Sequence, residues 1–449
     1  TTNFGEPLSV ESKKLVNDVR LRTTQPLCAE FDSDFNIYRF IMNAERIYKS
    51  RKEIVDHAVK TLNQHLRLRK CMRLDELRDI PFEENTIFKD RYMPCGEILT
   101  ETDCFNRLLW FIEYATISVE GIAHSMKSSE AIRYQFWQFE HMLRKVNKQE
   151  EKSGKLSSLR HIVDMNGYEI NPFTMLFVSS GTLSYYSQLF HYENYPELVK
   201  PIELVNIAKW IQVPYKLIKA MMPAGFSDRF RLHDGNFLQY LTSEISIEDI
   251  PTTLGGNNEH IKCIPSDKRS PSKYWQPSDE IDLPESLETI QISPRKSKNF
   301  RISVDKENYL LNWYFRTDGD VYFGVFYEPL SAKSVKDDGK DVEWAESKEM
   351  VYPWLKLSAK LYHEYDALLL TKPVGSIGGL STLLCTSQKQ KRILQKGISM
   401  TALRKLFLPL PSTPSHNFSI QKQFFKSTVL NSGQSNNSIM ELLYLIILT

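Results

Sequence analysis

Histidine, serine and carboxylate side chains occur at several places where a catalytic or metal site could be sought. A hydrolase needs a nucleophile and a base held together, but the chain has no G-x-S-x-G sequence, and the Gly-Thr-Leu-Ser run at 181–184 is not a nucleophile elbow. His57 and His65 lack the H-E-x-x-H pattern of a zinc site. His161, close to Asp164, is interpreted as a structural side chain. No credible catalytic set emerges, so we expect a protein that is not an enzyme.

Two further stretches resemble ligand loops only superficially. The Gly-Ser-Ile-Gly-Gly-Leu run at 375–380 lacks the Lys-Ser/Thr pair of a phosphate-binding loop. The Asp-Gly-Asp sequence at 318–320 is interpreted as a hairpin turn rather than as a calcium site. The six cysteines are scattered without a C-x-x-C pair, which predicts reduced thiols and no zinc or redox motif. We therefore expect neither a metal ion nor a cofactor.

The composition is that of a globular protein. Its 449 residues suggest two or three domains. A net charge of +2 gives no dominating basic field, which argues against a nucleic-acid-binding protein. No signal peptide is visible, and no run approaches the ~20 apolar residues of a membrane span, because the apolar stretch at 440–449 is too short. These features favour a cytoplasmic protein.

The first part of the chain carries helical patterns. Apolar residues recur at steps of three and four over 31–80, which predicts amphipathic helices within an N-terminal helical subdomain at 1–80. The second of these helices ends in a basic run at 67–73. We interpret this run as a solvated helix end, with a basic patch facing anionic lipid as the alternative.

Residues 107–165 carry the pattern of strand, helix and strand. The stretch 107–121 is apolar on both faces, as expected of a strand in a covered sheet, and a second strand is predicted at 159–165. An apolar helical stripe lies between them. Because parallel strands need a long crossover, this order predicts a βαβ unit and a mainly parallel sheet. The stripe consists of Ile132, Phe136, Phe139, Leu143 and Val146.

An amphipathic helix is predicted over 210–222, after a strand at 202–207. Lysines lie among its apolar residues, a combination that suits a membrane surface. A packed core helix with snorkelling lysines is an equally good interpretation. The apolar surface consists of Trp210, Ile211, Tyr215, Leu217, Ile218, Met221 and Met222.

The texture of the chain changes after Gly256. Residues 258–286 are rich in Pro, Ser, Lys and Asp and are interpreted as a linker. Short strands separated by turns then predict a small antiparallel β-sandwich over 287–373. Residues 374–449 show no sustained period, so we expect them to be poorly ordered and the sandwich to lack a convincing final strand.

Several short motifs, taken in order, resemble the CRAL-TRIO family of lipid-binding and lipid-transfer proteins. They are Ile-Val-Asp-Met-Asn-Gly at 162–167, Tyr-Pro-Glu at 195–197, Val-Asn at 205–206 and Leu-Gly-Gly at 254–256. Residues 132–140, 311–315 and 320–326 are similar to the animal branch that adds a C-terminal GOLD (Golgi-dynamics) sandwich. The resemblance covers about four-fifths of the chain.

The resemblance implies an α/β fold: a helical subdomain at 1–80, a mainly parallel-sheet lipid cage at 81–257, and a GOLD-like sandwich. In this family the cage holds one phospholipid or other lipophile and opens at a membrane through a gate helix, to which 210–222 correspond. Glu197 and Arg229 match positions that support the headgroup in the phosphatidylinositol-binding members. The tentative cavity lining is Phe136, Phe139, Leu143, Ile162, Tyr185 and Leu189.

The expected function is therefore binding and transfer of an intracellular lipid, by a protein that docks transiently on internal membranes and does not bind nucleic acid. The alternative is an adaptor in which the GOLD-like sandwich recruits a protein partner and the lipid is structural or regulatory.

Overall fold

The computed structural model divides the chain into two compact units, which are described separately. In the first unit it describes residues 2–168, 194–208, 229–233 and 235–276. In the second it describes residues 288–290, 297–298, 300, 302–304, 309–318, 320–328, 348–370, 374–381 and 420–423.

The first unit begins with three helices: α1 (Val10–Arg22), α2 (Asp34–Ile47) and α3 (Arg51–Met72). Each follows a serine, at 9, 33 or 50, whose hydroxyl accepts a hydrogen bond from a backbone amide of the first turn. Their apolar faces pack together, which confirms the N-terminal helices expected from the sequence. Short turns η1 (Leu74–Asp79), η2 (Phe82–Glu84) and α4 (Thr86–Lys89) lead to the sheet.

A five-stranded sheet in the order β1-β2-β3-β4-β5 forms the centre of this unit. Its strands are β1 (Glu97–Thr102), β2 (Leu108–Glu113), β3 (Leu159–Asp164), β4 (Val199–Val205) and β5 (Phe230–Leu232). β1 runs antiparallel to β2, whereas β2 to β5 are parallel, so the predicted mainly parallel sheet is confirmed. The strand expected over 107–121 ends at Glu113, because Ser118 caps a helix, α5 (Val119–Ala123).

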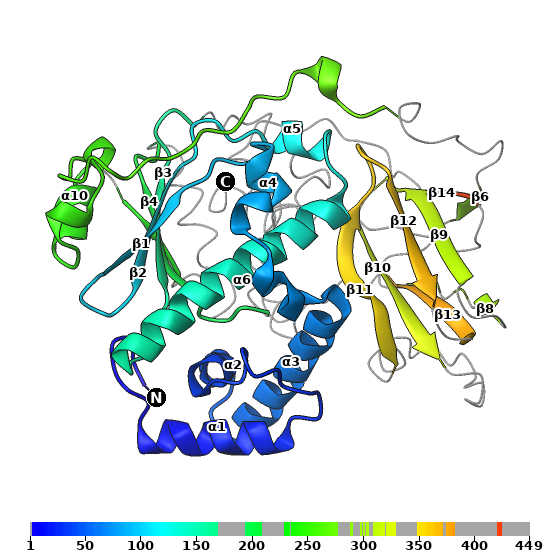
Figure 1. Ribbon diagram of the computed structural model, residues 1–449, viewed down its shortest axis with the longest axis horizontal. Helices are drawn as coiled ribbons and strands as arrows, with labels where there is room; N and C mark the ends of the chain where they lie inside the picture. Colours follow the sequence, from blue (N-terminus) through cyan, green and yellow to red (C-terminus); the bar gives the residue numbers. More distant parts are fainter. Residues whose placement is uncertain are drawn as a thin grey trace, which may run out of the picture. The chain divides into compact units, whose positions relative to one another are not determined.

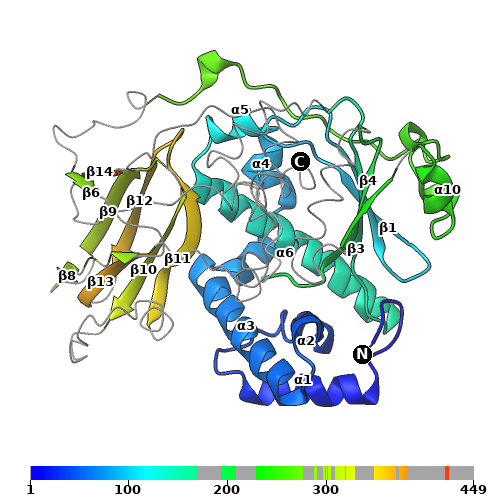
Figure 2. The ribbon, with the colours of Figure 1, turned by 180° about the vertical axis from the view of Figure 1, so that it is seen from behind.

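Helices cover both faces of the sheet. The long helix α6 (Ser128–Ser153) lies on one side and α10 (Phe237–Thr242) on the other (Figures 1 and 2). Because side chains alternate along a strand, β3 sends Arg160, Ile162 and Asp164 to one face and Leu159, His161 and Val163 to the other. We call these the α10 face and the α6 face.

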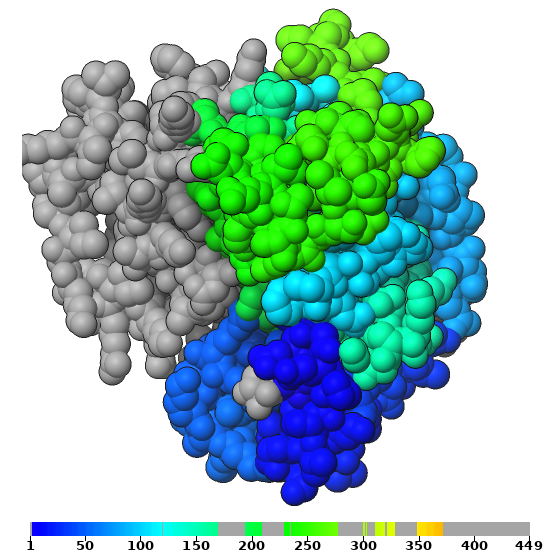
Figure 3. Space-filling view, turned by 90° about the vertical axis from the view of Figure 1, so that its left-hand side faces the viewer, coloured from blue at the N-terminus to red at the C-terminus, as the bar shows by residue number. Residues whose placement is uncertain are grey.

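The α10 face has a compact apolar core. Ile162, Phe111 and Val205 of the sheet pack against Leu241 of α10 and Leu254 of η7 (Thr252–Leu254). Another turn, η6 (Ile247–Asp249), lies between these two elements. Figure 3 shows this side of the unit, with the green segment after β5 lying beside the cyan residues of β1 and β2.

Residues 257–276 pack along the first unit, although most of them were assigned to a linker from the sequence. Backbone hydrogen bonds join Cys95 and Ile264 in both directions. After the turn η8 (Pro271–Lys273), Tyr274 stacks on His124 and Trp275 is buried. Polar and charged residues dominate the composition of this strap, so its few anchoring residues gave no periodic signal.

The second unit consists of two antiparallel sheets (Figure 1). One has the order β11-β10-β13-β7, with β8 also paired to β13, and the other has the order β12-β9-β14-β6. Trp313 and Phe315 of the second sheet contact Phe323 of the first, with ring centroids 5.5 and 5.2 Å away, so aromatic side chains join the sheets. The small antiparallel β-structure expected at the C-terminus is thus present. The strands are β6 (Glu288–Ile290), β7 (Ser297–Lys298), β8 (Ile302–Val304), β9 (Tyr309–Arg316), β10 (Asp320–Glu328), β11 (Glu349–Ser358), β12 (Glu364–Leu370), β13 (Val374–Ser381) and β14 (Ile420–Gln423).

A strand follows Pro373, where poor order and no convincing final strand were expected. β13 pairs with β10 along one edge and with β7 and β8 along the other. Its small residues have weak strand propensity, but ladder hydrogen bonds on both edges hold it in the sheet. β14 is a second strand in the segment that was expected to be poorly ordered; the rest of 382–449 lies outside the described residues.

Candidate functional site

A buried tyrosine fixes the segment that precedes β4. The hydroxyl of Tyr195 donates a 2.5 Å hydrogen bond to Glu140 of α6, and its ring stacks on Phe139 with the centroids 5.0 Å apart. Arg69 of α3 binds the same carboxylate through two guanidinium nitrogens, at 2.5 and 3.0 Å. Because these groups are buried, the contacts attach residues 195–197 firmly to both helices.

Two residues further along, the fully buried carboxylate of Glu197 is surrounded by cations. One of its oxygens accepts a 2.8 Å bond from Arg229, immediately before β5. The other lies 2.5 Å from a guanidinium nitrogen of Arg46 in α2 and 3.4 Å from the ammonium of Lys200 in β4. We call Arg46, Glu197, Lys200 and Arg229 the basic cluster.

The basic cluster carries more positive than negative charge. Three cations and one carboxylate leave a formal charge of +2, while Arg46 and Lys200 remain partly exposed, with 17% and 24% of their side-chain surfaces accessible. Burial alone would raise the pKa of Glu197, but Arg229, Lys200 and Arg46 together lower it. Burial and the two arginines lower the pKa of Lys200 despite its contact with Glu197. The field of these four side chains alone therefore favours an additional anion.

The structure brings together the two residues singled out from the sequence, Glu197 and Arg229. Sequence reasoning missed the other two members of the basic cluster. Lys200 lies three residues after Glu197 and could have been found by its spacing. Arg46 lies 151 residues before Glu197 in the chain, so only the tertiary fold reveals its role.

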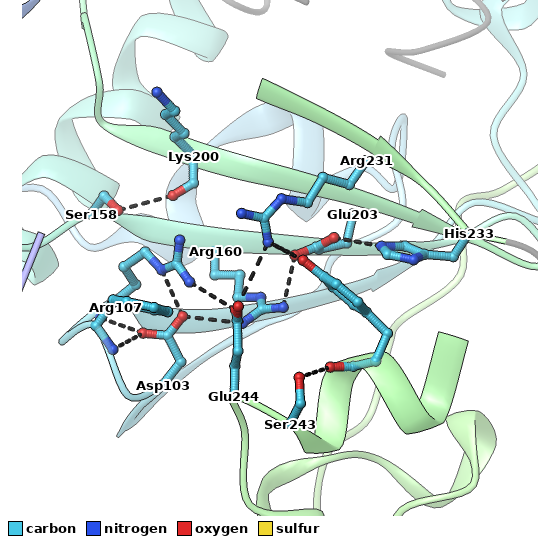
Figure 4. A network of polar contacts seen from close by, with 12 residues as sticks. Asp103, Arg107, Ser158, Arg160, Lys200, Glu203, Arg231, His233, Ser243 and Glu244 are labelled. Carbon is cyan, nitrogen blue, oxygen red and sulfur yellow. Dashed lines mark hydrogen bonds and ion pairs between the residues drawn. The ribbon is translucent and has the colours of Figure 1, made fainter. Parts of the chain in front are cut away.

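A second charged cluster lies on the α10 face of the sheet (Figure 4). The fully buried guanidinium of Arg160 lies 2.8 Å from Glu203, 2.5 Å from Glu244 and 3.2 Å from Asp103. His233 contacts Glu203 at 2.6 Å. Lys200, although it lies on β4 beside this cluster, extends away from it in the same view.

The charges of this second cluster balance, and we call it the balanced cluster. Arg107 and Arg231 join Arg160, so that three arginines face the carboxylates of Asp103, Glu203 and Glu244. Burial raises the pKa of Glu203, but His233 and the arginines outweigh it and the net pKa is lowered. With no formal charge left over when His233 is neutral, the cluster is suited to joining strands rather than to holding an ion.

The structure groups only some of the proposed cavity residues. Phe136 and Phe139 of α6 both contact the ring of Tyr195, and Leu143 is buried on the same helix. Ile162 lies instead on the α10 face, in the core with Leu241. Tyr185, Leu189 and the whole proposed gate helix at 210–222 lie outside the described residues.

Among the described residues there is neither a membrane-spanning helix nor a metal-binding group. No helix among them is both long enough and apolar enough to cross a membrane. Nor do their His, Cys, Asp and Glu side chains form a group of three or more suited to a metal ion.

Comparison with known proteins identifies a domain within this unit. Residues 96–256 match the model of the CRAL/TRIO domain, and residues 8–77 match that of a domain of unknown function (DUF8435). A CRAL-TRIO domain-containing protein of Caenorhabditis elegans is 22% identical over 339 residues, covering 75% of this chain and 80% of the relative. Residues 96–256 thus carry a CRAL/TRIO domain. Neither family match extends into the second unit, so the GOLD resemblance of that unit remains a prediction.

Proposed function

We propose that this CRAL/TRIO domain protein binds a lipophilic ligand with an anionic headgroup and exchanges it at membrane surfaces, without catalysing a reaction on it. The observation that carries the proposal is the net positive basic cluster, in which three cations from distant segments converge on one buried carboxylate. Glu197 holds the cations in place, and Arg46 and Lys200, which are partly exposed, bind the anionic group together with Arg229. A phospholipid such as phosphatidylinositol has the required chemistry.

The apolar part of the ligand lies against the α6 face of the sheet. This face presents apolar side chains such as Val163, Ile202 and Leu204, and α6 contributes Phe136 and Phe139. Sheltering acyl chains from water stabilises the complex by about 0.8 kcal/mol per buried methylene. We propose Phe136, Phe139 and Leu143 as lining residues, together with Tyr185 and Leu189 from outside the described part of the chain.

Transfer of fluorescent lipids between vesicles tests the headgroup assignment. We expect Arg229→Met to lower the transfer of phosphatidylinositol about tenfold, the effect of one charged hydrogen bond, and to leave phosphatidylcholine transfer nearly unchanged. Arg231→Met, on the strand that follows, is the matched control because Arg231 belongs to the balanced cluster. The assignment is contradicted if Arg229→Met lowers the transfer of both lipids equally. It is also contradicted if Arg231→Met lowers phosphatidylinositol transfer as much as Arg229→Met does.

Exchange at membranes is proposed to use the amphipathic segment 210–222 as a gate, in a protein located in the cytoplasm and on internal membranes. When the gate opens, its apolar residues would exchange their contacts with the ligand for contacts with the membrane. Replacing Leu217 and Ile218 with Asp should abolish vesicle-to-vesicle transfer, while the purified variant still retains bound lipid. If a folded variant transfers lipid at the normal rate, the gate assignment is wrong. The adaptor function would be favoured if the bound lipid never exchanges with vesicles and residues 287–373 bind a protein partner.

A further inference from the structure

One buried histidine lies in the middle of the α6 face, and no hydrogen bond to the described residues accounts for its polar ring. His161 is the third residue of β3, the central strand, and its register partner on β2 is Trp110. The two rings are stacked almost parallel, with centroids 3.6 Å apart and planes inclined by 8°. Only 1% of His161 is accessible to solvent, so its imidazole is removed from water.

The ring nitrogens of His161 make no hydrogen bond with the described residues. Within the part of the chain that the structure describes, neither Nδ1 nor Nε2 has a hydrogen-bond partner. Burial lowers the pKa of His161 to about 3, so the ring is neutral near physiological pH and has one N–H donor and one acceptor. Buried polar groups are normally hydrogen-bonded, because an unmade bond is costly away from water. An ordinary core position would favour an apolar ring of the same size.

The surroundings define what kind of group could supply the missing bond. On this face of the sheet the neighbours of His161 include Leu159 and Val163 on its own strand and Ile202 and Leu204 on β4, all of them buried. No cation is among these neighbours to compensate an anion, and a charged group beside a neutral imidazole would be expensive to bury. An uncharged oxygen can accept from or donate to the ring at no such cost.

We propose that His161, held in place by its stack on Trp110, is an interior polar contact that binds an uncharged hydroxyl or carbonyl oxygen of the ligand. This inference rests on the proposed function, because it places the body of the ligand on the α6 face. It adds a second recognition element of different chemistry: the basic cluster binds charge, and His161 selects a lipophile that carries a neutral oxygen within its apolar part.

The test compares two probes and two proteins in a thermodynamic cycle. The probes are 1-dodecanol and tridecane, which have equal numbers of heavy atoms and differ in the hydroxyl. The proteins are the delipidated full chain and its His161→Phe variant, in which a ring of similar size keeps the stack on Trp110. Equilibrium dialysis gives the preference for the alcohol in each protein. We expect this preference to be about three- to tenfold greater in the parent than in the variant, and the comparison cancels the different solubilities of the probes.

A second measurement detects the contact directly. In protein labelled with ¹⁵N-histidine, 1-dodecanol should shift a ring nitrogen of His161, and tridecane should not. Equal preferences in the two proteins, with both probes bound, would overturn the role of His161 and leave the proposed function standing. Failure of the parent to bind either probe would contradict the apolar site itself and with it the proposed function. Near-UV circular dichroism checks that the variant is folded.

Discussion

Glu197 shows how one acidic side chain can serve a site for anions. A carboxylate would normally repel such a ligand, but this one is fully buried and contacts three cations. Its backbone has a φ of 58°, a left-handed conformation that is unusual for a residue other than glycine. The tertiary contacts that hold this conformation also fix the directions of the cations. Glu197 is therefore a positioning residue, and the positive side chains are the ones that meet the ligand.

The contribution of Glu197 to stability should depend on pH. Because its folded-state pKa is lowered, its contribution is present above the unfolded value of about 4.3 and is lost as the pH falls through the folded pKa. We expect Glu197→Gln to reduce the free energy of unfolding by about 3–5 kcal/mol at pH 7, since three buried or half-buried cations lose the negative charge that Glu197 supplies. Urea unfolding from pH 7 to pH 3 measures this, and the difference between the two proteins should shrink toward the acid end. A difference that stays constant over this range would contradict the account.

At the scale of secondary-structure elements, the balanced cluster joins segments that are far apart in the sequence. Arg160 in β3 connects the turn after β1, strand β4 and the residues after α10 through Asp103, Glu203 and Glu244. Loss of Arg160 would leave these carboxylates with fewer cations in a buried place. The cluster thus holds α10 and its following turns against the sheet, next to the apolar core formed by Ile162 and Leu241.

Arg160→Met should therefore be strongly destabilising, by about 3–5 kcal/mol in urea unfolding. Arg231→Met is the matched comparison, because Arg231 contacts the same Glu203 but leaves 36% of its side chain exposed. Because solvent screens such a group, we expect Arg231→Met to lower the free energy of unfolding by only about 1 kcal/mol. Similar losses for the two variants would show that burial of the cluster does not decide its energetics.

The whole molecule shows which features a sequence can disclose. The parallel core of the sheet was predictable, because β2 and β3 are continuously apolar and α6 has a regular apolar stripe between them. β1 was missed because it is an edge strand in which only Leu99 is buried. The same buried character of β3 explains why the sequence could not assign Ile162 to one face of the sheet. Since both faces of this strand are covered, alternation alone could not indicate which side chains meet α6.

The candidate site divides in a similar way. The Tyr-Pro-Glu motif and Arg229 could be found from the sequence, since they match positions of a known family. Arg46 could not, because its proximity to Glu197 depends on how α2 packs in the folded unit. The sequence could not show that His161 lacks a hydrogen-bond partner, because a histidine in an apolar strand normally has one. Only the folded structure shows that its ring nitrogens have none among the described residues.

All the described residues that we assign to ligand binding lie before residue 277, within the first unit. Ligand binding should therefore survive separation of the chain at the stretch between Gln276 and Glu288. A protease site inserted there and cut after purification of the folded full chain tests this. The strap at 257–276 stays with the first unit, to which Tyr274 and Trp275 attach it. We expect the released first part to bind phosphatidylinositol-containing vesicles with the affinity of the uncut protein. A marked loss of affinity would show that the second unit contributes to the site, whereas unchanged binding with loss of a protein partner would give the second unit a separate recruiting role.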